Sequence, residues 1–393
     1  MAVREGIKPA IVVVAYRRLD TLDRLLKSIA AAKYRTEGIP LIISIDHHPD
    51  NSDVIALAEA FVWEHGEKTV KTHEKNLGLR THILECGNYA EEYGSVILLE
   101  DDEFVAPYFY EYAKKAHEYY DGDERIAGIS LYGHEWNPYA GKIFRPLRTG
   151  ADVFFGQFSC TWGQSWSADQ WKRFRKWYEE NGEEIGRDEL LPPPVYDWKN
   201  SWGKYFFRYL TESGRYYVIP QKPVVTVFGG AGTHYRKPEA EVQTTLWLGE
   251  PDHRLVPFEE GPHYDAFFEN ADLKGFLAKR FSIPEEEILI DLYGLKHRLI
   301  PEKYRYVISS RKLDSRIMAG YELNLRPQEA NVLNDCKGDA IFLYDRSERI
   351  KNRRYRKDAR LNYDFGGVFG FEALSYGYRH LWDALLRYAG LRK

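Results

Sequence analysis

The sequence predicts an α/β protein with a mostly parallel sheet flanked by helices and a C-terminal α+β extension. Runs of Val, Ile and Leu alternate with helical patterns of about ten to fifteen residues, as in parallel strands joined by right-handed crossovers. One such run ends in three consecutive acids, and beyond residue 245 the alternation fades. We therefore expect a catalytic sheet domain at residues 1–245 and a helical and mixed domain at residues 246–393.

Composition narrows the class of protein. The chain has 393 residues, of which 44% are hydrophobic and 29% charged, as is typical of soluble proteins. The formal net charge of -4 argues against a nucleic-acid partner. The 3 cysteines show neither metal-ligand spacing nor even pairing, and no run predicts a membrane span or a secretory leader. We therefore expect a protein of a reducing, cytoplasmic compartment.

The first strands are predicted by β-branched runs at residues 9–15, 41–46 and 69–72. Apolar residues at helical spacing follow the first run, and Asn51 or Ser52 can cap the helix after the second. The turn after the first strand lacks the pattern Gly-x-Gly-x-x-Gly. This argues against a dinucleotide-binding oxidoreductase.

The central strand is predicted at residues 95–99, and it runs directly into Glu100, Asp101 and Asp102. Ligands of open α/β sheets bind outside the carboxyl ends of strands, so these acids are expected in a crevice. Crowded carboxylates raise one another's pKa unless a cation compensates, and oxygen ligands favour Mg²⁺ or Mn²⁺ with substrate phosphates completing the shell. The alternative is a solvated acidic turn before a helix.

Two stretches after the acids have an unusual composition. A helix at 105–120 and a strand at 126–131 are followed by the aromatic, uncharged run 154–166, which suits either a pocket wall or a core segment. Three prolines then lead to Asp197, which lies between two large aromatic residues. Apolar neighbours raise the pKa of a carboxyl, which suits a general base; the alternative is the N-cap of a helix that begins near Trp202.

A glycine-rich run at residues 229–232 leads to His234. Glycines let backbone N–H groups approach a phosphate closely, and His234 is either a metal or phosphate ligand or a structural histidine. Farther on, residues 265–299 are predicted to be mainly helical. The helical pattern 371–393 is basic and apolar, so it either lies on an anionic membrane surface or packs on its own domain.

Residues 1–235 resemble the GT-A nucleotide-sugar glycosyltransferases, in particular the N-acetylglucosaminyltransferase I group and bacterial family 2 enzymes. The likeness rests on four motifs, which are Ala15-Tyr16-Arg17, Ser44-Ile45-Asp46, the block 96–107 and Asp197-Trp198. Animal enzymes of that group carry a membrane anchor, and we expect none here, so the acceptor need not be a glycoprotein.

The resemblance implies a role for each matched residue. Tyr16, Arg17 and Asp46 would hold the nucleotide base, and Glu100 and Asp101 the ribose. Asp102 and His234 would bind Mn²⁺ or Mg²⁺ at the diphosphate. The other implied donor-site residues are Ala15, Arg80, Trp162 and Gly163, and the last two would border the donor sugar. Asp197 would deprotonate the acceptor hydroxyl.

We therefore expect a metal-dependent glycosyltransferase that moves a sugar from a nucleoside-diphosphate donor, UDP favoured, to a hydroxyl of a glycan or lipid-linked acceptor. A single base facing the anomeric carbon from the side opposite the leaving group implies inversion. The alternatives are a non-catalytic carbohydrate-binding protein and a sugar-nucleotide pyrophosphorylase. The expected location is cytoplasmic, at the inner face of the membrane if the C-terminal helix binds lipid. Residues 246–393 would supply an acceptor platform, a dimer surface or a membrane contact, and the donor sugar and the oligomeric state are left open.

Overall fold

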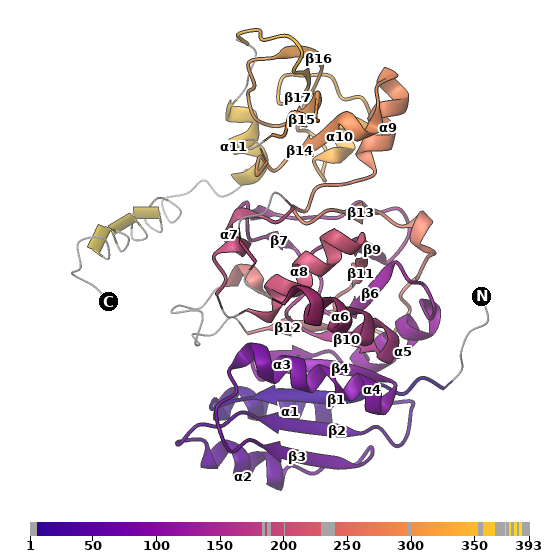
Figure 1. Ribbon diagram of the computed structural model, residues 1–393, viewed down its shortest axis with the longest axis vertical. Helices are drawn as coiled ribbons and strands as arrows, with labels where there is room; N and C mark the ends of the chain where they lie inside the picture. Colours follow the sequence, from indigo (N-terminus) through magenta and orange to yellow (C-terminus); the bar gives the residue numbers. More distant parts are fainter. Residues whose placement is uncertain are drawn as a thin grey trace. The chain divides into compact units, whose positions relative to one another are not determined.

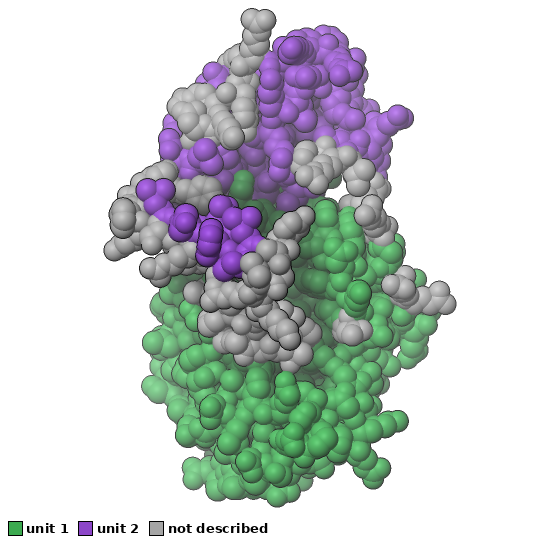
Figure 2. Space-filling model, turned by 90° about the vertical axis from the view of Figure 1, so that its left-hand side faces the viewer, with its two compact units in different colours: residues 1–277 green, residues 278–393 purple. Residues whose placement is uncertain are grey.

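The computed structural model describes residues 6–182, 185–186, 190–199, 201–228, 240–296, 300–352 and 357–365, and residues 374, 377–378, 381–382 and 385–386. The chain divides into two compact units, Met1–Leu277 and Ala278–Lys393 (Figures 1 and 2). Residues 246–277, which the sequence groups with the C-terminal domain, belong to the first unit. Each unit has its own sheet.

The first unit is built on a sheet that has nine strands among the described residues, in the order β13-β9-β11-β6-β10-β4-β1-β2-β3 (Figure 1). Neighbours from β4 to β3 are parallel, as are β6 and β11, whereas β10 runs antiparallel to both β4 and β6. The strands are β1 Ala10–Ala15, β2 Leu41–Ile45, β3 Lys68–Thr72, β4 Ser95–Glu100, β6 Ile126–Ser130, β9 Val153–Gly156, β10 Gln164–Ser167, β11 Tyr216–Pro220 and β13 His263–Tyr264. The predicted α/β class with a mostly parallel sheet is confirmed.

Burial on both faces explains the apolar runs of the central strands. Every residue of β1 and β2 is buried, because helices cover both faces of a parallel sheet. Alternate residues of β1, such as Ile11 and Val13, join one core with residues of α1, α2 and α5, while α3 and α4 contact β1 and β4. The described helices of the first unit are α1 Leu19–Ala30, α2 Ser52–Ala60, α3 Leu79–Gly87, α4 Tyr89–Tyr93, α5 Phe109–Tyr119, α6 Ala168–Asn181, α7 Pro193–Tyr196 and α8 Trp202–Ser213. The unit boundary falls inside α9, Leu273–Phe281.

Short elements lie beside the main sheet. β5 (Glu103–Val105) follows the acids and pairs antiparallel with β12 (Val225–Val227). β7 (Trp136–Asn137) pairs with β8 (Lys142–Ile143), and η1 (Ala240–Val242) and η2 (Phe258–Glu260) are single 3₁₀ turns.

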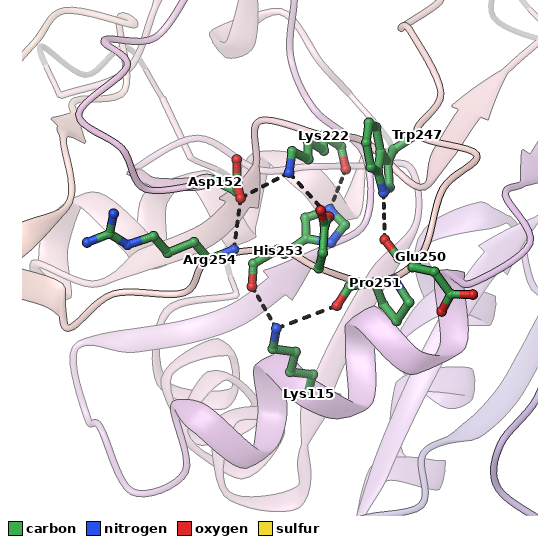
Figure 3. A network of polar contacts seen from close by, with 9 residues as sticks. Lys115, Asp152, Lys222, Trp247, Glu250, Pro251, His253 and Arg254 are labelled. Atoms are coloured by element: carbon green, nitrogen blue, oxygen red, sulfur yellow. Dashed lines mark hydrogen bonds and ion pairs between the residues drawn. The ribbon is translucent and has the colours of Figure 1, made fainter.

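A polar network around Lys222 ties residues 251–254 to other parts of the first unit (Figure 3). Lys222 Nζ lies 3.1 Å from Asp152 Oδ2 and 3.2 Å from Asp252 Oδ1. His253 is buried, its Nε2 lies 2.7 Å from the Lys222 carbonyl, and its own carbonyl accepts a 2.7 Å bond from Lys115 Nζ. We call these five residues the Lys222 network.

The second unit is α+β, as predicted. Its sheet has the order β14-β15-β17-β16, in which only β14 and β15 are parallel. The elements are β14 Ile288–Asp291, β15 Tyr306–Ser309, β16 Arg316–Tyr321, β17 Ile341–Asp345, η3 Glu285–Glu287, α10 Glu329–Leu333 and α11 Lys357–Phe365. The mainly helical prediction for 265–299 is wrong, because Ile288–Asp291 pairs with β15 and only α9 is an α-helix among the described residues of that range. None of the described helices is both long and apolar enough to span a bilayer.

Candidate functional site

The candidate site lies at the carboxyl ends of β1 and β4. These strands are parallel neighbours in register, with Val14 opposite Glu100, and the Asp101 N–H donates a 3.1 Å bond to the Val14 carbonyl. The crossover from β1 leads to β2 on one side, whereas β4 lies on the other side of β1. Strand order therefore reverses here, and such a switch point is where open α/β sheets bind ligands.

Arg18 bonds to two of the acids from the turn that follows β1. Its Nη1 lies 3.0 Å from Asp102 Oδ2 and its Nε 3.4 Å from Asp101 Oδ2, and Nη2 forms a close ion pair with Asp101 Oδ1. Asp101 is buried, whereas Arg18 and Asp102 are half-buried. Sequence reasoning missed Arg18, although an arginine directly after the first strand was a usable signal for an anion partner.

The carboxyls of Glu100, Asp101, Asp102 and Glu103, which we call the acid cluster, are poorly compensated. Burial raises the pKa of Glu100 well above its usual range, and the charges of Asp102 and Asp101 raise it further. Burial raises the pKa of Asp101 to about 6, even though Arg18 opposes the rise. Burial, with Glu100 and Asp102 adding to it, also raises the pKa of Glu103 well above its usual range. The cluster therefore favours a further cation or proton.

The acid cluster fits a divalent cation that is held by one or two carboxylates and completed by phosphates. Asp102 Oδ1 is buried and has no hydrogen-bond partner, which leaves one carboxylate oxygen for such a ligand. Across the described residues, no three His, Cys, Asp or Glu side chains converge on a metal-sized site. His234 and residues 229–233 lie outside the described residues; Phe228, just before them, donates from its N–H to the Asp102 carbonyl at 3.1 Å.

Asp46, the predicted base ligand, has its carboxylate already engaged. It is buried at the end of β2 and accepts bonds from the N–H groups of His47 and Leu77, both at 2.8 Å, and of Gly78 at 3.0 Å. Asn51 Nδ2 bonds to the carbonyls of Asp46 at 2.9 Å and Tyr16 at 3.1 Å. These bonds tie the ends of β1 and β2 together, so Asp46 fixes the backbone beside the candidate site.

Tyr16 and Arg17 continue from Ala15, the last residue of β1. Tyr16 is half-buried and packs edge-on against His48 with ring centroids 5.3 Å apart, and the exposed Arg17 guanidinium lies 5.8 Å from the Tyr16 ring centre. Tyr16 therefore offers a partly exposed ring at the carboxyl end of β1.

Trp162 and Gly163 are linked to the acid cluster through Glu103. Gly163 donates from its N–H to Glu103 Oε1 at 3.1 Å. Its φ of +56° and the 2.9 Å that would separate an added Cβ from Val225 both favour glycine. Trp162 is half-buried, whereas Phe154, Phe155 and Trp166 are fully buried. The aromatic run is therefore core in β9 and β10 and partly exposed at Trp162.

The last two predicted site residues, Arg80 and Asp197, form no hydrogen bond or ion pair with the acid cluster among the residues that the structure describes. Arg80 is bonded to α8, and Asp197 is an exposed residue after α7. Arg80, in α3, donates from Nη1 to the Tyr205 hydroxyl of α8 at 2.7 Å. Asp197 ends α7 and is exposed, so the burial that the sequence predicts for its carboxyl is absent. The N-cap of α8 is Ser201, so the alternative role for Asp197 is wrong. The neighbouring Trp198 is half-buried, with its ring centroid 6.4 Å from that of Tyr139.

No family model matches the chain, and no curated protein matches it in sequence. Among solved structures, it is similar to the mannosyltransferase PcManGT from Pyrobaculum calidifontis in complex with GDP-Man and Mn2+, at 12% identity and a TM-score of 0.36 over 58% of this chain and 59% of that chain. It is similar to S. aureus TarS 1-349 in complex with UDP-GlcNAc, at 12% identity and a TM-score of 0.36 over 57% and 60%. It is also similar to GalNAc-T7 with UDP, GalNAc and Mn2+, at 13% identity and a TM-score of 0.38 over 55% and 42%. The matched part of this chain therefore spans at most 60% of these structures, and likeness at this distance assigns no activity.

Proposed function

We propose that this chain is a metal-dependent, inverting GT-A glycosyltransferase that transfers a sugar from a nucleoside diphosphate, UDP favoured, to a hydroxyl of a glycan or lipid-linked acceptor. The observation that carries the proposal is the acid cluster at the switch point between β1 and β4, where Asp102 keeps a buried oxygen without a partner. A diphosphate donor needs a cation at such a place, and uncompensated carboxylates attract one.

The donor side of the mechanism follows from the charges. A Mn²⁺ or Mg²⁺ ion held by Asp102, with His234 as a further candidate ligand, would supply Lewis-acid stabilisation of the charge that develops on the departing diphosphate. Tyr16 and Arg17 would bind the base and Glu100 the ribose. Trp162 and Gly163 would border the sugar, because Gly163 is bonded to Glu103 of the acid cluster.

The acceptor side depends on Asp197. Asp197 is exposed, so an acceptor can reach its carboxylate, which would take the proton of the acceptor hydroxyl as that oxygen bonds to the anomeric carbon and the carbon–phosphate oxygen bond breaks. Attack from the face opposite the diphosphate inverts the anomeric centre. The half-buried rings of Trp198 and Tyr139 offer apolar faces on which an acceptor sugar can stack.

A binding experiment separates this function from a non-catalytic carbohydrate-binding protein. Thermal melting is measured with UDP or GDP, with and without Mn²⁺, and a transferase should show metal-linked stabilisation equivalent to about 2.7 kcal/mol at a hundredfold excess of nucleotide over Kd. A shift with saccharides alone, and none with nucleotide plus Mn²⁺, would instead support the binding protein. Release of sugar from common nucleotide sugars, followed in the same samples, then identifies the donor.

The base is tested by Asp197→Asn. This change should leave nucleotide binding unaltered and lower turnover by about 10² to 10⁴-fold, since a general base contributes that much. Asp53→Asn, an exposed aspartate of α2, is the matched control and should keep full activity. Full activity of Asp197→Asn would assign the base to another residue.

We also propose that residues 371–393, which belong to the second unit, bind an anionic membrane surface. Five large apolar side chains there are 53% to 75% exposed, and these are Leu374, Tyr378, Leu381, Trp382 and Leu385. They recur at helical spacing in a segment that also contains four Arg or Lys residues. Co-sedimentation with vesicles containing phosphatidylglycerol should be lost in Leu381→Gln/Trp382→Gln and kept in the exposed control Val62→Gln; equal sedimentation would contradict the proposal.

A further inference from the structure

Arg18 occupies the acid cluster with a side chain that can move while its backbone stays fixed. Its carbonyl accepts bonds from the Leu22 N–H at 3.2 Å and the Thr21 hydroxyl at 3.1 Å, which hold the turn before α1. The guanidinium alone reaches Asp101 and Asp102, and about a third of the side chain is exposed. A change of side-chain rotamer is therefore enough to release the acids.

Charge balance decides what Arg18 does when a divalent cation arrives. A dication on the free oxygen of Asp102 would share this carboxylate with the guanidinium, and two cations a few ångström apart repel each other. The neighbouring Arg24 acts on Asp102 through its charge alone, because its guanidinium stacks on Phe228 with Cζ 3.4 Å from the ring centroid. Arg18 is thus the side chain whose bond to Asp102 Oδ2 a dication on Oδ1 would weaken.

A diphosphate provides the destination for the released guanidinium. The planar fork of arginine fits phosphate and carboxylate oxygens with the same paired geometry, so exchanging one for the other preserves its hydrogen bonds. We propose that Arg18 is a ligand of the donor diphosphate, held on Asp101 and Asp102 until a divalent cation takes Asp102. This inference rests on the proposed function, and it adds a residue and an order of events to it.

Arg125 provides a matched comparison within the same unit. It binds Asp123 through Nε at 2.9 Å and Nη2 at 2.8 Å, and it forms a close ion pair with Glu259. This arginine also binds one aspartate through two nitrogens and a second acid through a third. It precedes β6, at the amino end of that strand, where the switch-point argument predicts no ligand.

The experiment compares Arg18→Gln, Arg18→Lys and Arg125→Gln with the full chain by isothermal titration. Mn²⁺ alone should bind Arg18→Gln about tenfold more tightly than the unaltered chain, because the competing cation is gone. UDP or GDP with saturating Mn²⁺ should bind Arg18→Gln about tenfold more weakly, because a charged hydrogen-bond donor to phosphate is missing. Arg125→Gln should change neither affinity.

Arg18→Lys keeps the charge and loses the fork. Arg18→Lys should bind Mn²⁺ alone with the affinity of the unaltered chain, and it should bind the nucleotide several-fold more weakly. If Arg18→Gln does not fold, the nucleotide affinity of Arg18→Lys tests the inference instead. Unchanged or weaker Mn²⁺ binding in Arg18→Gln would overturn the inference, as would unchanged nucleotide binding. If the unaltered chain binds no nucleotide with Mn²⁺, the proposed function fails and the inference fails with it. If the unaltered chain binds nucleotide with Mn²⁺, and Arg18→Gln binds both Mn²⁺ and nucleotide with the same affinities, the inference alone fails.

Discussion

The acid cluster and the Lys222 network are both groups of charged side chains in the first unit, but their charges are matched to different degrees. In the network, Lys222 bridges two aspartates, and Asp152 Oδ2 also accepts the Arg254 N–H at 2.9 Å (Figure 3). In the acid cluster, Arg18 serves two of four carboxyls, and Asp102 and Glu103 each keep a buried oxygen without a partner.

This difference separates structural from functional use of charge. Paired charges join segments that are distant in sequence, and they add stability only because each carboxylate has its donor. Buried carboxyls without donors cost stability, so a fold that carries them is expected to recover that cost when a ligand binds. Changing one residue in each group should therefore affect different properties.

Between the two groups, the largest difference is expected in activity, for Asp102→Ala. Metal-dependent transfer should fall by about 10² to 10³-fold, since a missing electrostatic stabiliser at the leaving group typically costs that much. The melting temperature should stay the same or rise, because the substitution removes a carboxylate that is only half compensated. Initial rates at saturating Mn²⁺ and thermal melting measure the two quantities. If Asp102→Ala lost much stability but kept its activity, the acid cluster would have a structural role, as the Lys222 network does here.

Asp152→Ala should show the opposite pattern. It removes the acceptor of the Arg254 N–H and a partner of Lys222, which should lower the free energy of unfolding by about 2 kcal/mol and Tm by several degrees. Nucleotide binding with Mn²⁺ should be unchanged. Asp53→Asn, on the exposed face of α2, is the control for removing a charge and should not shift Tm. If Asp152→Ala lost nucleotide affinity without losing stability, the Lys222 network would belong to the site.

Sequence reasoning found the elements whose signal is local. The strands β1, β2 and β4 are continuous apolar runs because both of their faces are buried, and the acids follow the last of them directly. β14 was missed because four residues after an acidic turn resemble part of a helix until they pair with β15.

The parts of the site that could not be predicted depend on tertiary pairing. Arg18 and Asp101 are separated by 83 positions, and only the β1–β4 register brings them together. The engagement of Asp46 likewise depends on the N–H groups of Leu77 and Gly78, which belong to the connection between β3 and α3. A carboxylate at a strand end is predictable, whereas the donors that occupy it are not.

The smallest expected effect is on the pH dependence of stability, to which Asp101 of the acid cluster and His253 of the Lys222 network should contribute in opposite directions. The pKa of Asp101 is raised to about 6 by burial, so the native state binds a proton that the unfolded state has released between about pH 4 and 6. Stability contributed by this group therefore falls as pH rises through that window. Burial lowers the pKa of His253, so there the unfolded state binds the extra proton, and stability falls as pH drops below about 6.5.

Melting temperatures between pH 4.5 and 7.5 test this contrast. Asp101→Asn should gain stability relative to the unaltered chain as pH rises from 4.5 to 6.5, by on the order of 1 kcal/mol. His253→Gln should lose less stability than the unaltered chain on acidification, because the buried imidazole that resists protonation is gone. The slope of melting temperature against pH is compared between each variant and the unaltered chain, because each substitution also removes hydrogen bonds whose contribution does not depend on pH. Parallel slopes in both variants would mean that the acid cluster is compensated as fully as the Lys222 network, and the case for a cation at Asp102 would lose its electrostatic basis.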